Sequence, residues 1–427
     1  MSNESGVPIA PRRTWLQSLG PGLITGAADD DPSGIATYSQ VGAQFGYGMG
    51  WVMLFSYPLM AAIQVVSARI GCVTGVGIAA NLHRHYSPWL LRGAVALLLV
   101  ANVANLGADL GAMGAALQLL VGGPGLLFTM GFGVLCVLLE TFLRYRRYAG
   151  VLKLLTLSLF AYVAVVFAVR VDWVRALRGV LLPTITLDAS HMEALVAVLG
   201  TTISPYLFFW QAAEEVEERN ARRAPPLRDA PGELAAEVPR ELARIDADTW
   251  IGMGYSNLVS LFIIIATAAT LHQAGIVDIQ TSSQAAEALR PIAGEATFAL
   301  FACGIVGTGM LAVPVLAGSS AYAVSESFGW AEGLDLSWRE ARAFYAVIAA
   351  ATAIGAGLNL TPLDPVKALY WSAVLNGLLA APLMATMLVV ATNRRIMGAL
   401  VLPGYLRVLG WAGVVAMAMA GIAFLVV

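Results

Sequence analysis

Three consecutive carboxylates, Asp29, Asp30 and Asp31, interrupt an apolar segment near the start of the chain and are followed directly by Pro32. A proline inside a helix removes a backbone donor and clashes with the preceding turn, so a helix is expected to break here. The break frees backbone carbonyls, and carbonyls combined with a carboxylate make a site for a hard cation. In the alternative, the aspartates lie in a surface loop between two short elements, but the stretch 35–47 is too short to cross a membrane.

A second apolar segment carries the same interruption. Residues 194–210 are apolar apart from Thr201, Thr202, Ser204 and Tyr206, and Pro205 stands near the middle. A lone proline often only kinks a membrane helix. Two prolines in corresponding helices, one of them beside carboxylates, instead indicate an inverted repeat whose two broken helices share a site at the membrane midplane.

Asp109 is the other acid inside an apolar segment, among small residues such as Gly107 and Gly111. Ionisable residues at membrane depth are expensive and are functional by default, so Asp109 is a candidate for the ion pathway or a proton relay. The small neighbours equally favour close helix packing, in which Asp109 would only bond another helix. Both interpretations stay open at this point.

Four glutamates follow the second interrupted segment: Glu214, Glu215, Glu217 and Glu218. We expect them at a solvated helix end on the cytoplasmic face. The chain contains no Walker motif, nucleophile elbow or HExxH motif, so the sequence does not indicate an ATPase, a hydrolase or any other enzyme.

The composition indicates the kind of protein that positions these carboxylates and prolines. Of the 427 residues, 58% are hydrophobic and only 12% are charged, whereas a soluble domain has about 25% charged residues. The mean hydropathy is +0.74. These values predict an all-α integral membrane protein whose partner is the lipid bilayer. The net charge of -2 gives no indication of nucleic-acid binding.

A spanning helix needs about 20 mostly apolar residues. We predict eleven spans, at residues 19–40, 49–70, 90–119, 125–142, 151–169, 192–213, 249–272, 296–325, 344–358, 368–391 and 405–427. With the N-terminus in the cytoplasm, 20 Lys and Arg residues fall on the inside and 5 on the outside, in agreement with the positive-inside rule. We therefore expect a multi-pass protein of the inner (plasma) membrane.

The spans divide into parts. Residues 1–18 form a cytoplasmic N-terminal segment, and residues 19–391 a ten-helix core with repeats at about 19–169 and 192–391. Residues 214–248 are expected to be a partly helical cytoplasmic linker, and residues 392–427 a cytoplasmic loop followed by the eleventh helix. We expect the protein to act as a monomer.

The motifs around the first span resemble those of the Nramp metal-ion transporters, which have GPG, then DPGN, then a stretch like GAQFGY. This chain has Gly20-Pro21-Gly22, then Asp31-Pro32-Ser33-Gly34, then Gly42-Ala43-Gln44-Phe45-Gly46-Tyr47. The sixth span is similar to the region of their MPH motif, and the eleven-span layout fits. The resemblance implies a LeuT-type fold of five-plus-five inverted repeats, with a divalent metal ion as transported substrate and no resident cofactor.

Carried over residue by residue, the resemblance makes Asp31 the main metal ligand and makes Ala28 and Thr201 carbonyl donors. We expect Ser204 as a further oxygen donor and Gly34 at the metal position, with Tyr206 on the ion pathway. The departures are Gly34 for an Asn ligand, Ser204 for Met, Tyr206 for His, and Ala112 for a Glu of the proton route; Asp109 keeps the family's Asp. A thioether selects softer metals, whereas hydroxyl and carbonyl oxygens suit Mg²⁺ and Mn²⁺. Small residues at these places leave room for a partly hydrated ion, which Asp29 and Asp30 could attract or bind through water.

This pattern is similar to the Nramp-related magnesium transporters, and the missing His and Glu put proton coupling in doubt. The sequence thus predicts a carrier of Mg²⁺ or Mn²⁺ that works by alternating access. The alternative is a LeuT-fold carrier of an organic solute such as an amino acid, in which half-helix N-termini bind a substrate carboxylate. A membrane sensor or scaffold is disfavoured because the sequence shows no soluble signalling domain.

Overall fold

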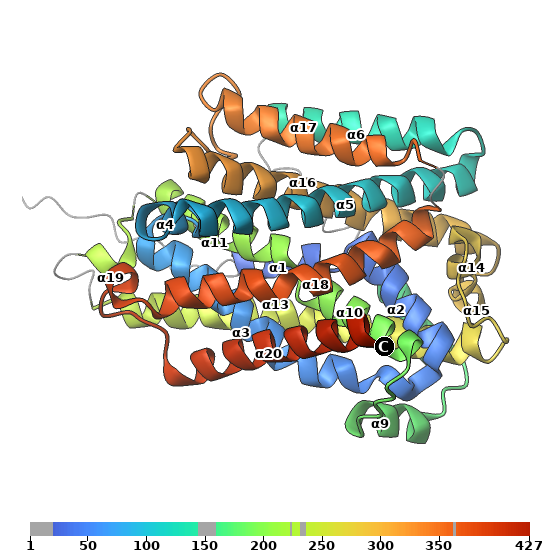
Figure 1. Ribbon diagram of the computed structural model, residues 1–427. Coiled ribbons are helices and arrows are strands. Elements are labelled where there is room, and N and C mark those ends of the chain that lie inside the picture. The colour runs from blue at the N-terminus through green and yellow to red at the C-terminus, as the bar shows by residue number, and fades with distance from the viewer. Residues whose placement is uncertain (1–19, 144–158, 223, 231–235, 362–363) are drawn as a thin grey trace, which may run out of the picture.

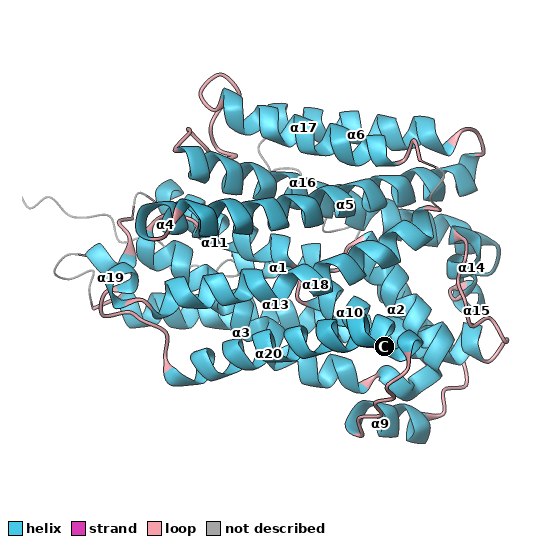
Figure 2. Ribbon diagram, in the orientation of Figure 1, coloured by secondary structure: helices cyan, strands magenta, loops and turns pink. Residues whose placement is uncertain are grey.

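The computed structural model of the chain describes residues 20–143, 159–222, 224–230, 236–361 and 364–427 (Figure 1). In this part the secondary structure is helical, and no strand occurs among the described residues (Figure 2). Eight helices of the described part are long and apolar enough to cross a membrane. The protein is therefore a multi-pass helical membrane protein, as the composition predicted.

Helices are found at each of the predicted spans, and the first and sixth are each divided in two. The helices, in chain order, are α1 (Pro21–Asp29) with α2 (Pro32–Phe45), α3 (Trp51–Thr74), α5 (Pro88–Val121), α6 (Gly125–Phe142), α8 (Phe160–Ala168), α10 (Ala189–Thr202) with α11 (Pro205–Ala221), α13 (Val238–Thr267), α16 (Thr297–Phe328), α17 (Arg342–Leu358), α18 (Pro365–Thr392) and α20 (Gly404–Val426). Part of the predicted fifth span, 151–158, lies outside the described residues, and α8 forms the rest.

Five short helices were not predicted, because they lack a long apolar run. They are α4 (Ile78–His85), α9 (Trp173–Leu181), α14 (Ser282–Glu287), α15 (Arg290–Ala293) and α19 (Arg394–Met397). Each lies in a connection between spans. Local capping explains one of them, since the Asp172 carboxylate accepts the backbone N–H of Arg175 at the start of α9.

The outer helices show which surface meets lipid. In Figure 1, α6 and α17 run together along one edge of the bundle, next to α5 and α16, and α20 lies on the opposite edge. Apolar side chains on the outer helices are exposed, including Leu127 (65%), Val134 (60%) and Ile422 (63%). Because these side chains cannot all face water, their belt matches a hydrocarbon environment.

The helices near the two breaks pack through glycines. A Cβ on Gly26 of α1 would lie 2.2 Å from the carbonyl oxygen of Gly252 on α13. A Cβ on Gly200 of α10 would lie 2.0 Å from the carbonyl oxygen of Ala373 on α18. Small residues allow such backbone contact in membranes, so each broken helix has one half packed directly on a continuous helix.

The four glutamates after the sixth span are not all solvated. Helix α11 continues to Ala221 and α13 begins at Val238, so much of the predicted linker 214–248 is helical. Glu214 is 3% exposed and Glu215 is fully buried. The expectation of a solvated helix end is therefore wrong for these two, because the helices extend beyond the apolar segment and pack together.

Candidate functional site

The first break lies at Asp30 and Asp31, between α1 and α2. Asp31 is extended (φ −73°, ψ 170°), and its Oδ1 atom caps α2 by accepting the N–H of Gly34 at 2.7 Å. The hydroxyl of Ser33 also donates to Oδ1, at 2.7 Å. Pro32 is the first residue of α2, where its missing N–H costs nothing. The helix is thus interrupted at Asp30 and Asp31, and the Asp31 carboxylate lies in the gap between α1 and α2.

The second break lies at Ile203 and Ser204, between α10 and α11. Pro205 is again the first residue of the second half. Ser204 occupies the position of Asp31, but its hydroxyl donates back to the carbonyls of Gly200 (3.0 Å) and Thr201 (2.9 Å). Its side chain makes no cap at the start of α11.

Tyr206 connects the two breaks. Its hydroxyl lies 3.0 Å from the carbonyl oxygen of Ala28, at the end of α1, and 3.3 Å from Oδ2 of Asp31. All three residues are about 1% exposed. A carboxylate, a backbone carbonyl and a hydroxyl from two different broken helices therefore meet at one buried point.

The spacing of these three oxygens suits a small divalent cation. Ligands about 2.1 Å from Mg²⁺ in an octahedron are separated by about 3 Å along each edge. The oxygens of Ala28 and Asp31 each lie at such a distance from the Tyr206 hydroxyl. The chemical set is all oxygen, which hard ions prefer. Tyr206, expected only in the pathway, is thus placed as a candidate ligand.

Thr201 faces the same gap from α10 through its side chain. A Cβ on Gly34 would lie 3.2 Å from Oγ1 of Thr201 and 3.4 Å from Oδ1 of Asp31. Oγ1 of Thr201 is buried and makes no hydrogen bond to any described residue. The structure therefore directs a free hydroxyl to this region, whereas the predicted Thr201 carbonyl accepts a bond from Ser204.

Asp109 on α5 is fully buried beside the first break. It faces Asp31 and the backbone amide of Ser33. Among the described residues, neither of its carboxylate oxygens has a hydrogen-bond partner. Because the Ser33 amide of another helix lies beside its carboxylate, the pathway and the helix-packing interpretations both stay open.

Asp29 and Asp30 point to α13 rather than to α11. The Ser256 hydroxyl lies 2.7 Å from Oδ2 of Asp29 and 2.9 Å from Oδ1 of Asp30. Sequence reasoning missed Ser256, because it stands in a continuous apolar span without any motif.

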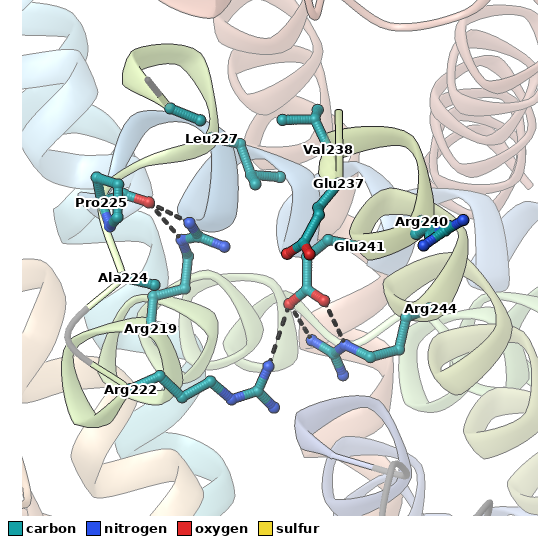
Figure 3. A pocket seen from close by; sticks show the side chains of 11 residues that line it. Arg219, Arg222, Ala224, Pro225, Leu227, Glu237, Val238, Arg240, Glu241 and Arg244 are labelled. Carbon is teal, nitrogen blue, oxygen red and sulfur yellow. Dashed lines mark hydrogen bonds and ion pairs between the residues drawn. The ribbon is translucent and has the colours of Figure 1, made fainter. Parts of the chain in front are cut away.

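Two cavities lie near the opposite ends of the bundle. One of about 420 Å³, at the ends of α11 and α13, is lined by Arg219, Arg222, Arg240 and Arg244 (Figure 3). Glu241 accepts bonds there from Arg222 (3.3 Å) and Arg244 (3.0 Å), and so connects the two helices (Figure 3). Because guanidinium groups repel a metal ion, this cavity is not a cation site.

At this same end the start of α1 is fixed to α13. Asp248 accepts the N–H groups of Gly20 (3.0 Å) and Gly22 (2.8 Å), and so caps α1 from another helix. The helix N-terminus favours a negative charge. This end of the bundle is therefore closed over α1 by charged and capping contacts.

The cavity at the other end, of about 410 Å³, has a different lining. It contains the amides of Gln40 and Gln44, the carboxylates of Glu193 and Asp278, and Lys367. Gln40 accepts the N–H of Ile279 at 2.8 Å, which holds the loop after α13 against α2. Its acidic and amide oxygens, with a single lysine, are compatible with a hydrated cation.

Comparison with known proteins adds independent information. The profile of the family described as natural resistance-associated macrophage protein-like (Nramp) matches residues 22–427. The "divalent metal cation transporter MntH" of Acidiphilium cryptum is 27% identical over 422 residues, covering 95% of this chain and 90% of that protein. MntH of Klebsiella pneumoniae strain 342 is 26% identical over 422 residues, covering 96% and 93%.

Solved structures agree with this fold. A crystal structure of the Eremococcus coleocola manganese transporter matches with a TM-score of 0.74 at 18% identity, covering 96% of this chain and 86% of that one. Mhp1, a nucleobase-cation-symport-1 family transporter, matches with a TM-score of 0.59 at 13% identity, covering 96% and 91%. The prediction of an all-α, LeuT-type fold is confirmed.

Proposed function

Because the chain belongs to the Nramp family, whose profile matches residues 22–427, we propose that it is a carrier of divalent metal cations. Relatives of similar length are named divalent metal cation transporters, and the fold is that of a manganese transporter. The family is one of transporters and not of enzymes, so the metal ion is the substrate and not a resident cofactor.

One observation carries the proposal. The hydroxyl of Tyr206 brings together Oδ2 of Asp31 and the carbonyl of Ala28 at distances of 3.3 and 3.0 Å. When an ion binds, the Asp31 carboxylate coordinates it and balances part of its positive charge. The Tyr206 hydroxyl then rotates its proton away, so that its oxygen faces the ion. Thr201 adds a hydroxyl from α10, and waters complete the shell beside Gly34. Ser204 supports the end of α10 through its bonds to the carbonyls.

The preferred ions are Mg²⁺ and Mn²⁺. The proposed ligands Asp31, Ala28, Tyr206 and Thr201 are all oxygen donors, and Mg²⁺ and Mn²⁺ prefer carboxylate, carbonyl and water ligands. Mg²⁺ dehydrates reluctantly, and Gly34 leaves space for its waters. A soft ion such as Cd²⁺ finds no sulfur in this ligand set and should be transported less well.

Transport is proposed to proceed without obligatory proton movement. Ala112 and Tyr206 stand where the family pattern has a Glu and a His, so only Asp109 remains of that route. The ion's own gradient would then drive the carrier.

The orientation follows from the distribution of basic residues, which places the N-terminus in the cytoplasm of the cell that carries this protein in its inner membrane. The cavity lined by Glu193 and Asp278 is then the outer entrance, and the end closed by Asp248 is the inner one. The ten-helix core of residues 19–391 suffices for alternating access, so we propose that the carrier works as a monomer.

The test is uptake of Mg²⁺ and Mn²⁺ into proteoliposomes with a pH dye inside. Two results together support an uncoupled hard-ion carrier. The unmutated protein takes up the ion without acidifying the vesicle, and Asp31→Ala abolishes this uptake. Acidification that follows the metal gradient overturns the uncoupled mechanism alone. Absence of uptake of both ions, together with uptake of an amino acid, overturns the substrate assignment in favour of an organic solute.

A further inference from the structure

The three aspartates of the first break separate into two groups. Asp31 faces Tyr206 on α11, whereas Asp29 and Asp30 face Ser256 on α13. In the part of the chain that the structure describes, no three acidic, histidine or cysteine side chains converge on one metal position. One ion at Asp31 therefore does not draw its ligands from all three carboxylates.

The Asp29–Asp30 pair lacks the partners that its burial requires. Both residues are at most 2% exposed. Ser256 has one proton and can donate it to only one carboxylate at a time, although both lie within 2.9 Å of its oxygen. Oδ1 of Asp29 and Oδ2 of Asp30 have no hydrogen-bond partner among the described residues. Unpaired buried charge costs several kcal/mol per ion.

A further side chain lies at this place. The Tyr38 phenol, about 1% exposed, interacts with Asp29, then with the Ser260 hydroxyl and then with Asp30. Its hydroxyl forms no hydrogen bond of standard geometry to the described residues. The electrostatic neighbours of the two aspartates include no lysine or arginine. Two carboxylates, the Ser256 oxygen and a phenol oxygen thus form a second hard donor set.

We propose that Asp29, Asp30, Ser256 and Tyr38 form a second divalent-cation position, on the α13 side of the break and distinct from the position at Asp31. This proposal rests on the proposed transport of divalent cations. The two charges of the pair match one Mg²⁺ or Mn²⁺. The ion keeps part of its water shell there, because the pair supplies few protein ligands. An ion at this position and an ion at Asp31 repel each other, which assists release.

Mn²⁺ binding to the purified full-length chain tests the proposal. Equilibrium dialysis should give two Mn²⁺ per unmutated chain, one for Asp31→Ala and one for the isosteric double variant Asp29→Asn/Asp30→Asn. Ser256→Ala should lower the affinity for one of the two ions by about tenfold, because it removes one bond to charged groups. Thr267→Ala is the control, because this buried hydroxyl lies about three turns further along α13 and donates to the carbonyl of Ile263. It should keep two ions with unchanged affinity.

Electron paramagnetic resonance adds a readout that a structural role would not change. Adjacent Cα atoms are about 3.8 Å apart, so ions at Asp30 and Asp31 lie within about 15 Å and broaden each other's Mn²⁺ signal. The broadening should disappear in Asp31→Ala and in the double variant. A single unbroadened ion in the unmutated protein overturns the second position. If Asp31→Ala still abolishes Mn²⁺ uptake in that case, the proposed transport stands.

Discussion

The two breaks share a backbone design and differ in charge. In each, two residues separate the end of one helix from a proline that starts the next half: Pro32 in the first and Pro205 in the second. The residue before the proline is Asp31 in one and Ser204 in the other. Asp31 reaches the gap, whereas Ser204 bonds the carbonyls of its own helix.

The residues after the prolines make the same contact from opposite sides. Ser33 donates to Oδ1 of Asp31, and Tyr206 lies within hydrogen-bond distance of Oδ2. One carboxylate is therefore oriented by both broken helices. The comparison teaches that the repeat supplies two interruptions, while the negative charge lies at the first one and the second one contributes only uncharged groups.

The largest expected effect separates the two residues before the prolines. Asp31→Ala should lower Mn²⁺ uptake by at least about 100-fold, because loss of a charged ligand exceeds the 10- to 100-fold typical of changes around a metal site's outer shell. Ser204→Ala, the matched change, should lower it by less than about threefold, because its hydroxyl only supports carbonyls. Initial uptake rates in proteoliposomes measure both, and equal effects would contradict the asymmetry.

The glycines beside the breaks should show that close helix packing occurs at both breaks, whereas the negative charge lies only at the first. Gly26→Ala and Gly200→Ala each place a methyl group within 2.2 Å of a backbone oxygen. Each should destabilise the protein by about 1–3 kcal/mol through overpacking. Gly131→Ala is the control, since nothing lies within 4 Å of its added Cβ in α6. It should be neutral or slightly stabilising. Melting temperatures in detergent measure these effects. An unchanged melting temperature for Gly26→Ala would contradict direct contact between α1 and α13.

A smaller effect distinguishes the residues after the prolines. Tyr206→Phe should raise the KM for Mn²⁺ by about tenfold, because it removes an oxygen that interacts with a charged site. Ser33→Ala should raise KM by about threefold at most, because the N–H of Gly34 still bonds Asp31. KM values from concentration series test this difference, and the reverse order would assign the ion to the Ser33 side.

The smallest effect concerns the start of the second broken helix. Asp188 accepts bonds from the hydroxyls of Thr186 and Ser190 and the amide of His191, and these hold its pKa at about 2, below the usual value. Because its folded pKa is lowered, its stabilising effect is complete above the unfolded pKa of about 3.9 and is lost as the pH falls to about 2. The melting temperature of Asp188→Ala should be slightly lower than that of the unmutated protein at pH 7. The difference should close near pH 2, and a gap independent of pH would contradict this cap.

Much of the fold was predictable because membrane helices carry their signal locally. Long apolar runs mark the spans, and Pro32 and Pro205 mark the breaks to within two residues. The short helices between spans and the burial of Glu215 were not predictable. They depend on capping and on packing between helices that are distant in the sequence.

The groups around the first break were predictable on their own helix and less so across helices. Asp31 was predicted as the main ligand from its neighbours in the chain, and its role as a ligand stays a prediction. Ser256 and Tyr38 were not, because nothing in their local sequence reveals which face of a continuous helix turns to the break. The Thr201 side chain was missed for the same reason: a resemblance carries over a position, not the direction of its groups.

The contact between α1 and α13 decides how the inner end can open. Asp248 holds the first turn of α1, and the backbones of Gly26 and Gly252 meet directly one helix turn further in. Helix α1 is thus held against α13 at its first turn and again at Gly26, and the helical hydrogen bonding stops between it and α2 at Asp30 and Asp31. A movement of α1 alone would break the cap on Gly20 and Gly22 and the backbone contact at Gly26. Any opening at this end that keeps these contacts therefore moves α1 and α13 together.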